Sequence, residues 1–244
     1  MTAEVLSCVA QPSAGVTARA CLLPRQEMEA AAATLAFDAK NYHAWAHRQA
    51  LVAAWDLWDE ELAFTEAVLA GDVRNNSAWN QRFFILTRGG PHQPAQADAG
   101  LADGTEPPPS PPVVIDAELS YVAAALHRAP DNASAWAYLR GLLTSPAGTD
   151  VSLQVDKVPD LCFKALQRLP SCTPAMDLLS EMYRARAAAA LQHDDVATAS
   201  LAMQHAETLH AALQVADPLR HPYWKFTNET LTLNTGKHEQ DQVY

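Results

Sequence analysis

Apolar residues along the chain gather in stretches that lack helix breakers, and turn-forming residues separate these stretches. The segment at residues 26–37 is rich in alanine and contains neither glycine nor proline, which favours a helix. No segment alternates apolar and polar residues with the period of two that a half-buried strand shows. The pattern therefore predicts an all-α protein.

Three tryptophans stand in the same sequence frame, which indicates internal repeats. They are Trp45, Trp79 and Trp136. An asparagine lies four positions before each and a leucine ten before: Asn41, Asn75 and Asn132; Leu35, Leu69 and Leu126. An arginine follows, three positions later for Arg48 and Arg82 and four later for Arg140. Trp45 and Trp79 are 34 residues apart, a period typical of stacked helical hairpins. We therefore expect a right-handed, TPR-like superhelical stack of antiparallel hairpins.

Local chemistry places the helices within these repeats. Asn41 is expected to cap a helix that begins at Tyr42, because asparagine side chains accept hydrogen bonds from first-turn amides. In the next repeat, Asp59 is expected to cap a helix that ends at Gly71, and a second helix runs to Gly89. The third repeat turns at residues 130–132. Two weaker hairpins are expected at residues 161–183 and 202–226, the second as the end of the stack.

Changes in amino-acid composition along the chain suggest where its segments begin and end. Residues 88–113 hold seven of the 16 prolines and four glycines, and are expected to form an extended insertion between helices. Residues 1–24 are expected to be an unstructured or non-homologous leader, and could alternatively be a weak organelle-type leader. The repeats are expected over residues 25–235, followed by a tail at 236–244.

The net charge and the distribution of cysteines indicate which partners and which cellular compartment to expect. The formal net charge is -11 and acidic residues are spread along the chain, which argues against a nucleic-acid partner. Cys8, Cys21, Cys162 and Cys172 form no CxxC pair, which suggests a reducing compartment. No apolar run is long enough to span a membrane, so we expect a cytoplasmic protein.

Most repeated residues have a structural interpretation. The three tryptophans should fill the space between hairpins, and the asparagines should cap helices. Arg48 and Arg82 should bridge to carboxylates or carbonyls of neighbouring turns, with Asp38 and Asp72 in equivalent places. His43 and His47 lie four positions apart, but no third ligand is evident in the sequence nearby, so no metal site is expected.

One helix start combines groups that suit an anion. Tyr42 and His43 belong to the first turn, and Lys40 immediately precedes the capping residue. A hydroxyl, an imidazole and an ammonium beside the positive end of a helix can contact a polyphosphate. The sequence shows no other catalytic constellation.

Four stretches, DAKNYHAWAHRQ, LWDEEL, DVRNNSAWNQRFF and NASAWAYLRGLL, resemble successive repeats of the α subunit shared by protein farnesyltransferase and protein geranylgeranyltransferase type I. The resemblance covers residues 26–144 and continues weakly to about residue 230. DVRNNSAWNQRFF resembles this subunit more than the Rab-type geranylgeranyltransferase α chain, which remains an alternative. A non-enzymatic helical-repeat adaptor is a further alternative.

The resemblance implies an α subunit that wraps around a catalytic β subunit and is not active alone. The β subunit would hold zinc, with magnesium for farnesyl transfer, and the prenyl diphosphate. The enzyme would join a farnesyl or geranylgeranyl group to the cysteine of a CaaX protein substrate. By resemblance, Tyr42 and His43 contact the diphosphate, while Lys40 and Asn41 belong to the substrate-binding edge.

The sequence departs from the family at its beginning. The family carries an upstream Lys-Asn-Tyr-Gln motif whose lysine and glutamine serve the diphosphate and the peptide carboxylate. Residues 1–25 show nothing similar. Lys40, Asn41 and Tyr42 repeat part of that motif, but His43 stands in place of the glutamine. We therefore expect an N-terminally truncated form of the α subunit.

Overall fold

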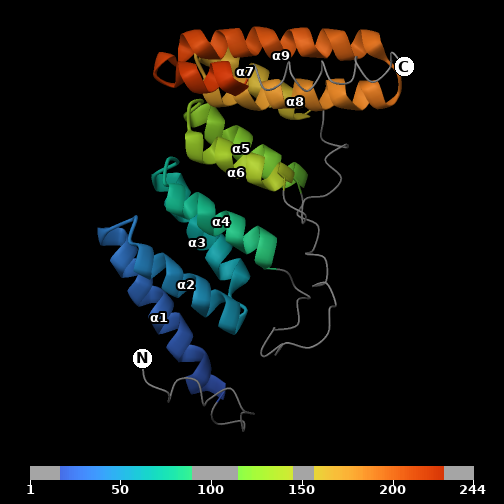
Figure 1. Cartoon of the computed structure of the whole chain (residues 1–244). Helices are drawn as coiled ribbons and strands as arrows, with labels where there is room; N and C mark the ends of the chain where they lie inside the picture. Colours follow the sequence, from blue (N-terminus) through green and yellow to red (C-terminus); the bar gives the residue numbers. More distant parts are fainter. Residues whose placement is uncertain (1–16, 90–114, 145–156, 228–244) are drawn as a thin grey trace. The chain divides into compact units, whose positions relative to one another are not determined.

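The computed structural model describes residues 17–89, 115–144 and 157–227 (Figure 1). These residues form helices α1 (Thr17–Phe37), α2 (Tyr42–Trp55), α3 (Trp58–Gly71), α4 (Asn76–Arg88), α5 (Ile115–Arg128), α6 (Ala133–Thr144), α7 (Lys157–Arg168), α8 (Thr173–Gln192) and α9 (Val196–Ala216), with a 3-10 turn η3 (Pro218–Arg220). No strand occurs among them, so the predicted all-α class and the helical hairpins are confirmed.

The chain divides into two compact units, residues 1–111 and 112–244. Unit 1 contains α1 to α4, and unit 2 contains α5 to α9 and η3. Helix α1 begins at Thr17 with Pro24 inside it, earlier than the expected start of the repeats at residue 25. Of the two alternatives given for residues 1–24, an unstructured leader is therefore wrong for residues 17–24, whereas a non-homologous leader stays a prediction. Of the insertion expected at residues 88–113, Arg88 ends α4 and Gly89 is its C-cap, while residues 90–113 and the tail at 236–244 lie outside the described residues.

The turns inside the hairpins repeat the same hydrogen bonds. The indole N–H of each repeat tryptophan donates to the carbonyl six residues earlier, over 2.8–3.0 Å: Trp45 to Ala39, Trp79 to Val73 and Trp136 to Pro130. The side-chain oxygen of each repeat asparagine accepts a first-turn amide, over 3.0–3.2 Å: Asn41 from Ala44, Asn75 from Ala78 and Asn132 from Ser134. The predicted caps are confirmed, and each tryptophan locks its own turn as well as filling space.

Neighbouring hairpins within a unit share one carbonyl at this turn. The Ala39 carbonyl accepts the Trp45 indole and also the side-chain amide of Asn75, 3.3 Å away in the next hairpin. In unit 2 the Pro130 carbonyl accepts the Trp136 indole and the thiol of Cys172, at 3.1 Å. Cys172 thus occupies the place of the repeat asparagine, four residues before the buried Met176.

Helix α3 starts differently from the expectation. Its N-cap residue is Leu57, whose side chain makes no capping bond, and the helix begins at Trp58. Asp59 therefore lies inside the first turn and is not the cap. Asp59, Glu60 and Glu61 all lie in that turn, where negative charge interacts favourably with the helix dipole. The predicted ends at Gly71 and Gly89 are confirmed, since Gly71 is the last residue of α3 and Gly89 is the C-cap of α4.

The end of the stack is organised around a long hairpin. Helix α9 packs along α8 after a tight turn in which Asp194 has a left-handed backbone (φ 58°) and Asp195 caps α9 through the Thr198 amide. The predicted hairpin at residues 202–226 is found only in part: α9 is followed by η3 and a short helical stretch at residues 221–227, but the main packing partner of α9 is α8. Trp224 then returns to pack on Met176 and Leu213 in a buried cluster.

His210 of α9 is buried in this region, 1% exposed, and its Nε2 accepts from Arg184 Nη1 at 2.8 Å. Burial lowers the pKa of His210 and the Arg184 charge lowers it further, while Asp177 and the backbone of Trp224 act in the opposite direction. The unfolded chain therefore binds a proton on this residue at higher pH than the folded chain.

We expect unit 2 to lose stability as pH falls below about 6.5, the ordinary pKa of histidine, until the folded-state pKa is passed. Hydrogen exchange of α8 and α9 amides between pH 8 and pH 5 measures this loss. His210→Gln should flatten the His210 part of the profile, and an unchanged slope in that variant would contradict the assignment.

Candidate functional site

The predicted anion-contact edge lies at the start of α2. Lys40, Tyr42 and His43 are all exposed, and Tyr42 is 77% exposed. The Tyr42 and His43 rings meet edge to face with centroids 5.7 Å apart. No acidic side chain occupies the first turn of α2. The structure therefore brings a hydroxyl, an imidazole and an ammonium to one accessible helix start.

Asn41 holds the backbone of this edge. Its side-chain oxygen caps the Ala44 amide at 3.0 Å, and its side-chain nitrogen lies 3.4 Å from Asp38 Oδ2. Asp38 Oδ1 accepts the Lys40 backbone amide at 3.2 Å. Because both polar atoms of the Asn41 side chain are used within the turn, Asn41 acts on this edge by orienting it.

A hollow of about 300 Å³ lies between α1 and α2 beside this edge, with His43 and His47 in its lining. Glu27 also lines it, and Glu27 Oε2 is 3.1 Å from His47 Nε2. Sequence reasoning missed Glu27 because it belongs to the preceding helix. No group of three or more metal-ligating side chains in binding geometry occurs among the residues that the structure describes.

Arg48 is the centre of a buried polar network in unit 1. It is 3% exposed, and its Nε and Nη2 donate to Glu61 at 2.5–3.1 Å. Its Nη1 donates to the Met28 carbonyl at 2.7 Å, and its guanidinium lies 3.6 Å above the Phe64 ring. Arg48 therefore bridges to a carboxylate and a carbonyl, as predicted, but its carboxylate is Glu61 of α3 and not Asp38. Arg82 pairs with Glu66 at 3.1 Å and not with Asp72.

In each of the first three hairpins, a polar side-chain contact also joins the two helices. A glutamate eighteen positions before the repeat tryptophan meets a residue two positions after it. The pairs are Glu27 with His47 at 3.1 Å, Glu61 with Gln81 at 2.7 Å and Glu118 with Tyr138 at 2.5 Å. The fourth hairpin has buried Val158 and Leu178 at these positions. The glutamate recurs eighteen positions before each of the three tryptophans, so the sequence could have predicted this contact.

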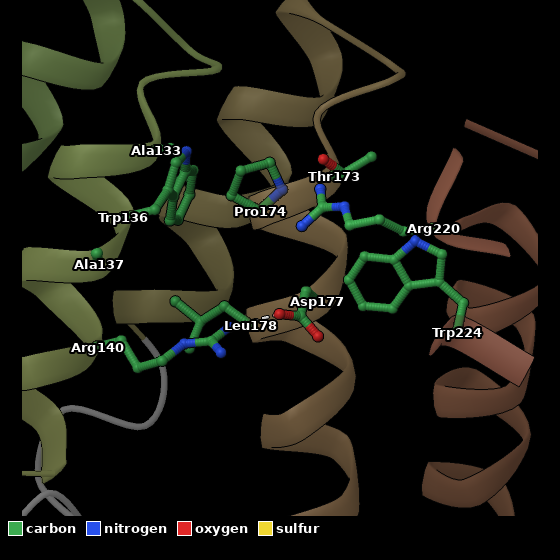
Figure 2. A pocket seen from close by; sticks show the side chains of 10 residues that line it. All are labelled: Ala133, Trp136, Ala137, Arg140, Thr173, Pro174, Asp177, Leu178, Arg220 and Trp224. Atoms are coloured by element: carbon green, nitrogen blue, oxygen red, sulfur yellow. Dashed lines mark hydrogen bonds and ion pairs between the residues drawn. The ribbon is translucent and has the colours of Figure 1, made fainter. Parts of the chain in front are cut away.

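Unit 2 has a pocket of about 190 Å³ on α6, α8 and the segment after α9 (Figure 2). Arg140 crosses from α6 to Asp177 at 2.8 Å and Glu181 at 3.0 Å on α8. Burial alone would lower the pKa of Arg140, but its hydrogen bond to Asp177 and the nearby carboxylate charges raise it. Arg140 is therefore a permanent cation that joins the third and fourth hairpins, although it lies one position later than Arg48 in the repeat frame.

Cys162 and Cys172 are unsuited to nucleophilic chemistry. Cys162 is fully buried, and burial raises the pKa of its thiol to about 12. Burial also raises the pKa of Cys172. Since only the thiolate is a strong nucleophile, both side chains serve packing and hydrogen bonding at neutral pH.

Comparison with known proteins supports the repeats identified in the sequence and the structure. Residues 24–55, 58–89 and 115–146 match the family model described as protein prenyltransferase alpha subunit repeat. The chain is 30% identical over 185 residues to the protein farnesyltransferase/geranylgeranyltransferase type-1 subunit alpha of Pisum sativum, covering 71% of this chain and 49% of that protein. It is 31% identical to the Arabidopsis thaliana protein of the same description, covering 72% and 50%.

The type-2 subunits are also similar. The geranylgeranyl transferase type-2 subunit alpha of Rattus norvegicus is 32% identical over 127 residues, covering 52% of this chain and 21% of that protein. The chain spans about half the length of the type-1 relatives that it matches. In the described part, no helix is both long and apolar enough to cross a membrane.

The matched segments coincide with the hairpins α1–α2, α3–α4 and α5–α6, whose tryptophans and asparagines make equivalent hydrogen bonds. The chain therefore belongs to the protein prenyltransferase alpha subunit repeat family.

Proposed function

We propose that this chain is the α-type subunit of a heterodimeric CaaX protein prenyltransferase. The observation that carries the proposal is the exposed helix start with Lys40, Tyr42 and His43, set in a repeat of a prenyltransferase α family. The partner would be a β subunit that binds the prenyl diphosphate and the CaaX protein at the subunit interface. The chain is not expected to act alone.

The share of this chain that aligns with each type of relative supports the type-1 assignment. Type-1 relatives align over 71–72% of this chain, whereas the Rattus norvegicus type-2 relative aligns over 52%.

In the proposed reaction, the substrate cysteine displaces diphosphate from the prenyl carbon and forms a thioether. Zinc in the β subunit would lower the pKa of that thiol.

The proposed role of this chain is to stabilise charge on the leaving group. The Tyr42 hydroxyl would donate a hydrogen bond to the diphosphate, and the Lys40 ammonium and His43 imidazole would lie beside it. Hydrogen-bond donors held in place before the reaction stabilise developing negative charge without reorganising. Asn41 would keep these side chains at the interface by fixing the turn through its capping bond.

The test is co-expression of the full chain with a prenyltransferase β subunit, followed by farnesyl and geranylgeranyl transfer to a CaaX peptide. Tyr42→Phe should lower kcat about 10–100-fold, which corresponds to one hydrogen bond to a charged group, with the complex intact. Tyr223→Phe is the matched control, since Tyr223 is exposed in unit 2, and it should leave kcat unchanged.

Three outcomes would contradict the proposal. Failure of the wild-type chain to bind any β subunit would favour a non-enzymatic adaptor. A complex that transfers the prenyl group only with an escort protein would favour a type-2 subunit. Equal kcat for wild type and Tyr42→Phe would show that the Tyr42 hydroxyl does not contribute to the reaction.

A further inference from the structure

The pocket of unit 2 combines an apolar lining with charged groups at its two ends. It lies on one face of α6, the start of α8 and the segment after α9 (Figure 2). Its volume is about 190 Å³, below the roughly 300–1,000 Å³ of sites for drug-sized ligands, so its size suits a small molecule. The apolar lining consists of Ala133, Trp136, Ala137, Pro174, Leu178 and Trp224.

Arg220 provides hydrogen-bond donors at one end of the pocket. Its Nε pairs with Asp217, and its Cζ lies 5.2 Å from the centre of the Trp224 ring. Its Nη1 and Nη2 make no hydrogen bond in the described part of the chain, and the side chain is 60% exposed. Figure 2 shows the guanidinium turned toward Thr173, whose hydroxyl makes no hydrogen bond to a described residue either. A guanidinium and a hydroxyl side by side suit a carboxylate.

Arg140 shows how one guanidinium of this unit serves two carboxylates. Its Nη2 donates to Asp177 at 2.8 Å, and its Nη1 is 3.0 Å from Glu181. Arg220 has one carboxylate, Asp217, on its Nε. The two Nη atoms of Arg220 therefore leave a place for a second carboxylate, which no described residue supplies.

Asp177 gives the pocket a negative end. Its Oδ2 accepts from Arg140, whereas its Oδ1 has no partner among the described residues, and the side chain is 20% exposed. Asp177 and Glu181 share the single charge of Arg140. The nearby Arg184 is directed to His210 Nε2, at 2.8 Å. A ligand cation beside Asp177 Oδ1 would therefore meet an acceptor that is not saturated.

We infer that this pocket binds a small zwitterion, an α-amino acid with an apolar side chain. The ligand carboxylate accepts hydrogen bonds from Arg220 and Thr173, and the ligand ammonium donates to Asp177. The apolar side chain lies against the lining that includes Trp136 and Trp224. Because the two ends differ in the sign of their charge, a ligand with both charges fits better than a simple anion or cation. The inference does not depend on prenyl transfer.

The test is a titration of the full chain, labelled with fluorotryptophan, with L-leucine as the probe and fluorine NMR as the readout. The Trp224 signal is identified by its loss in Trp224→Phe. We expect L-leucine to shift this signal until it saturates. Leucinamide lacks the carboxylate and N-acetyl-leucine lacks the ammonium, so each should bind about tenfold or more weakly, the loss of one hydrogen bond between charged groups.

Two substitutions assign the ends of the pocket. Arg220→Gln should lower the affinity for leucine to that for leucinamide, and Asp177→Asn should lower it to that for N-acetyl-leucine. Arg186→Gln, at an exposed position of α8, is the control for the first and should leave binding unchanged. Glu181→Gln is the control for the second, because it also takes a carboxylate from Arg140 but does not alter the pocket lining.

Three results would overturn the inference. One is the absence of a saturable shift with L-leucine. Another is equal affinity for the three ligands, which would mean that only the apolar side chain is bound. The third is a loss in Glu181→Gln as large as that in Asp177→Asn, which would mean that Asp177 acts through Arg140. The comparison of the three ligands uses the unaltered chain, so it holds even where a variant fails to fold.

Discussion

Glu61→Gln is expected to lower the free energy of unfolding of unit 1 by about 3–5 kcal/mol, the cost of breaking a buried ion pair. The Arg48 side chain is 4% exposed and that of Glu61 0% exposed, so the variant leaves a buried guanidinium without its counter-charge. Gln81 Nε2 also loses its carboxylate acceptor at 2.7 Å. Hydrogen exchange of α2 and α3 amides, measured on the full chain, gives the change in opening free energy.

The neighbouring Glu60→Gln is the control for this prediction. Glu60 pairs with Arg25 at 2.5 Å, but both side chains are at least half exposed. An exposed ion pair is worth about 0–1 kcal/mol, so the two adjacent substitutions should differ several-fold in effect. Similar small losses for both variants would show that the Arg48–Glu61 pair does not hold the two hairpins together.

Trp79→Ala is expected to lower the free energy of unfolding of unit 1 by about 3–5 kcal/mol as well, for a different reason. Trp79 is 1% exposed, so its removal leaves a cavity in the second hairpin. The variant also removes the indole donor to the Val73 carbonyl at 2.8 Å, a bond that closes the turn between α3 and α4. Exchange of α3 and α4 amides should therefore accelerate most.

Trp55→Ala provides the comparison within the same unit. Trp55 ends α2 and is 40% exposed, so its removal creates less cavity and should cost about 1 kcal/mol. A loss for Trp79→Ala no larger than that for Trp55→Ala would contradict the view that the repeat tryptophans anchor the hairpins.

The sequence by itself determined the repeat frame and the local structure within it. Asn41 and Asn75 cap their helices as predicted, because a capping bond joins residues only three positions apart. The ends at Gly71 and Gly89 also lie where the sequence places them, but neither glycine has a positive φ, and a Cβ at Gly89 would lie 2.6 Å from the Trp58 ring. The candidate edge at Tyr42 and His43 could also be placed, since it required only the position of a helix start.

Only the tertiary structure decided which distant side chains meet. Asp38 and Glu61 were both available to Arg48, and the packing of α2 on α3 selected Glu61. In the same way α9 packs on α8, and Cys172 takes over a hydrogen bond that an asparagine makes in unit 1. The physical reason is that capping and helix length depend on neighbours along the chain, whereas a buried ion pair or an interhelical bond depends on how whole helices pack.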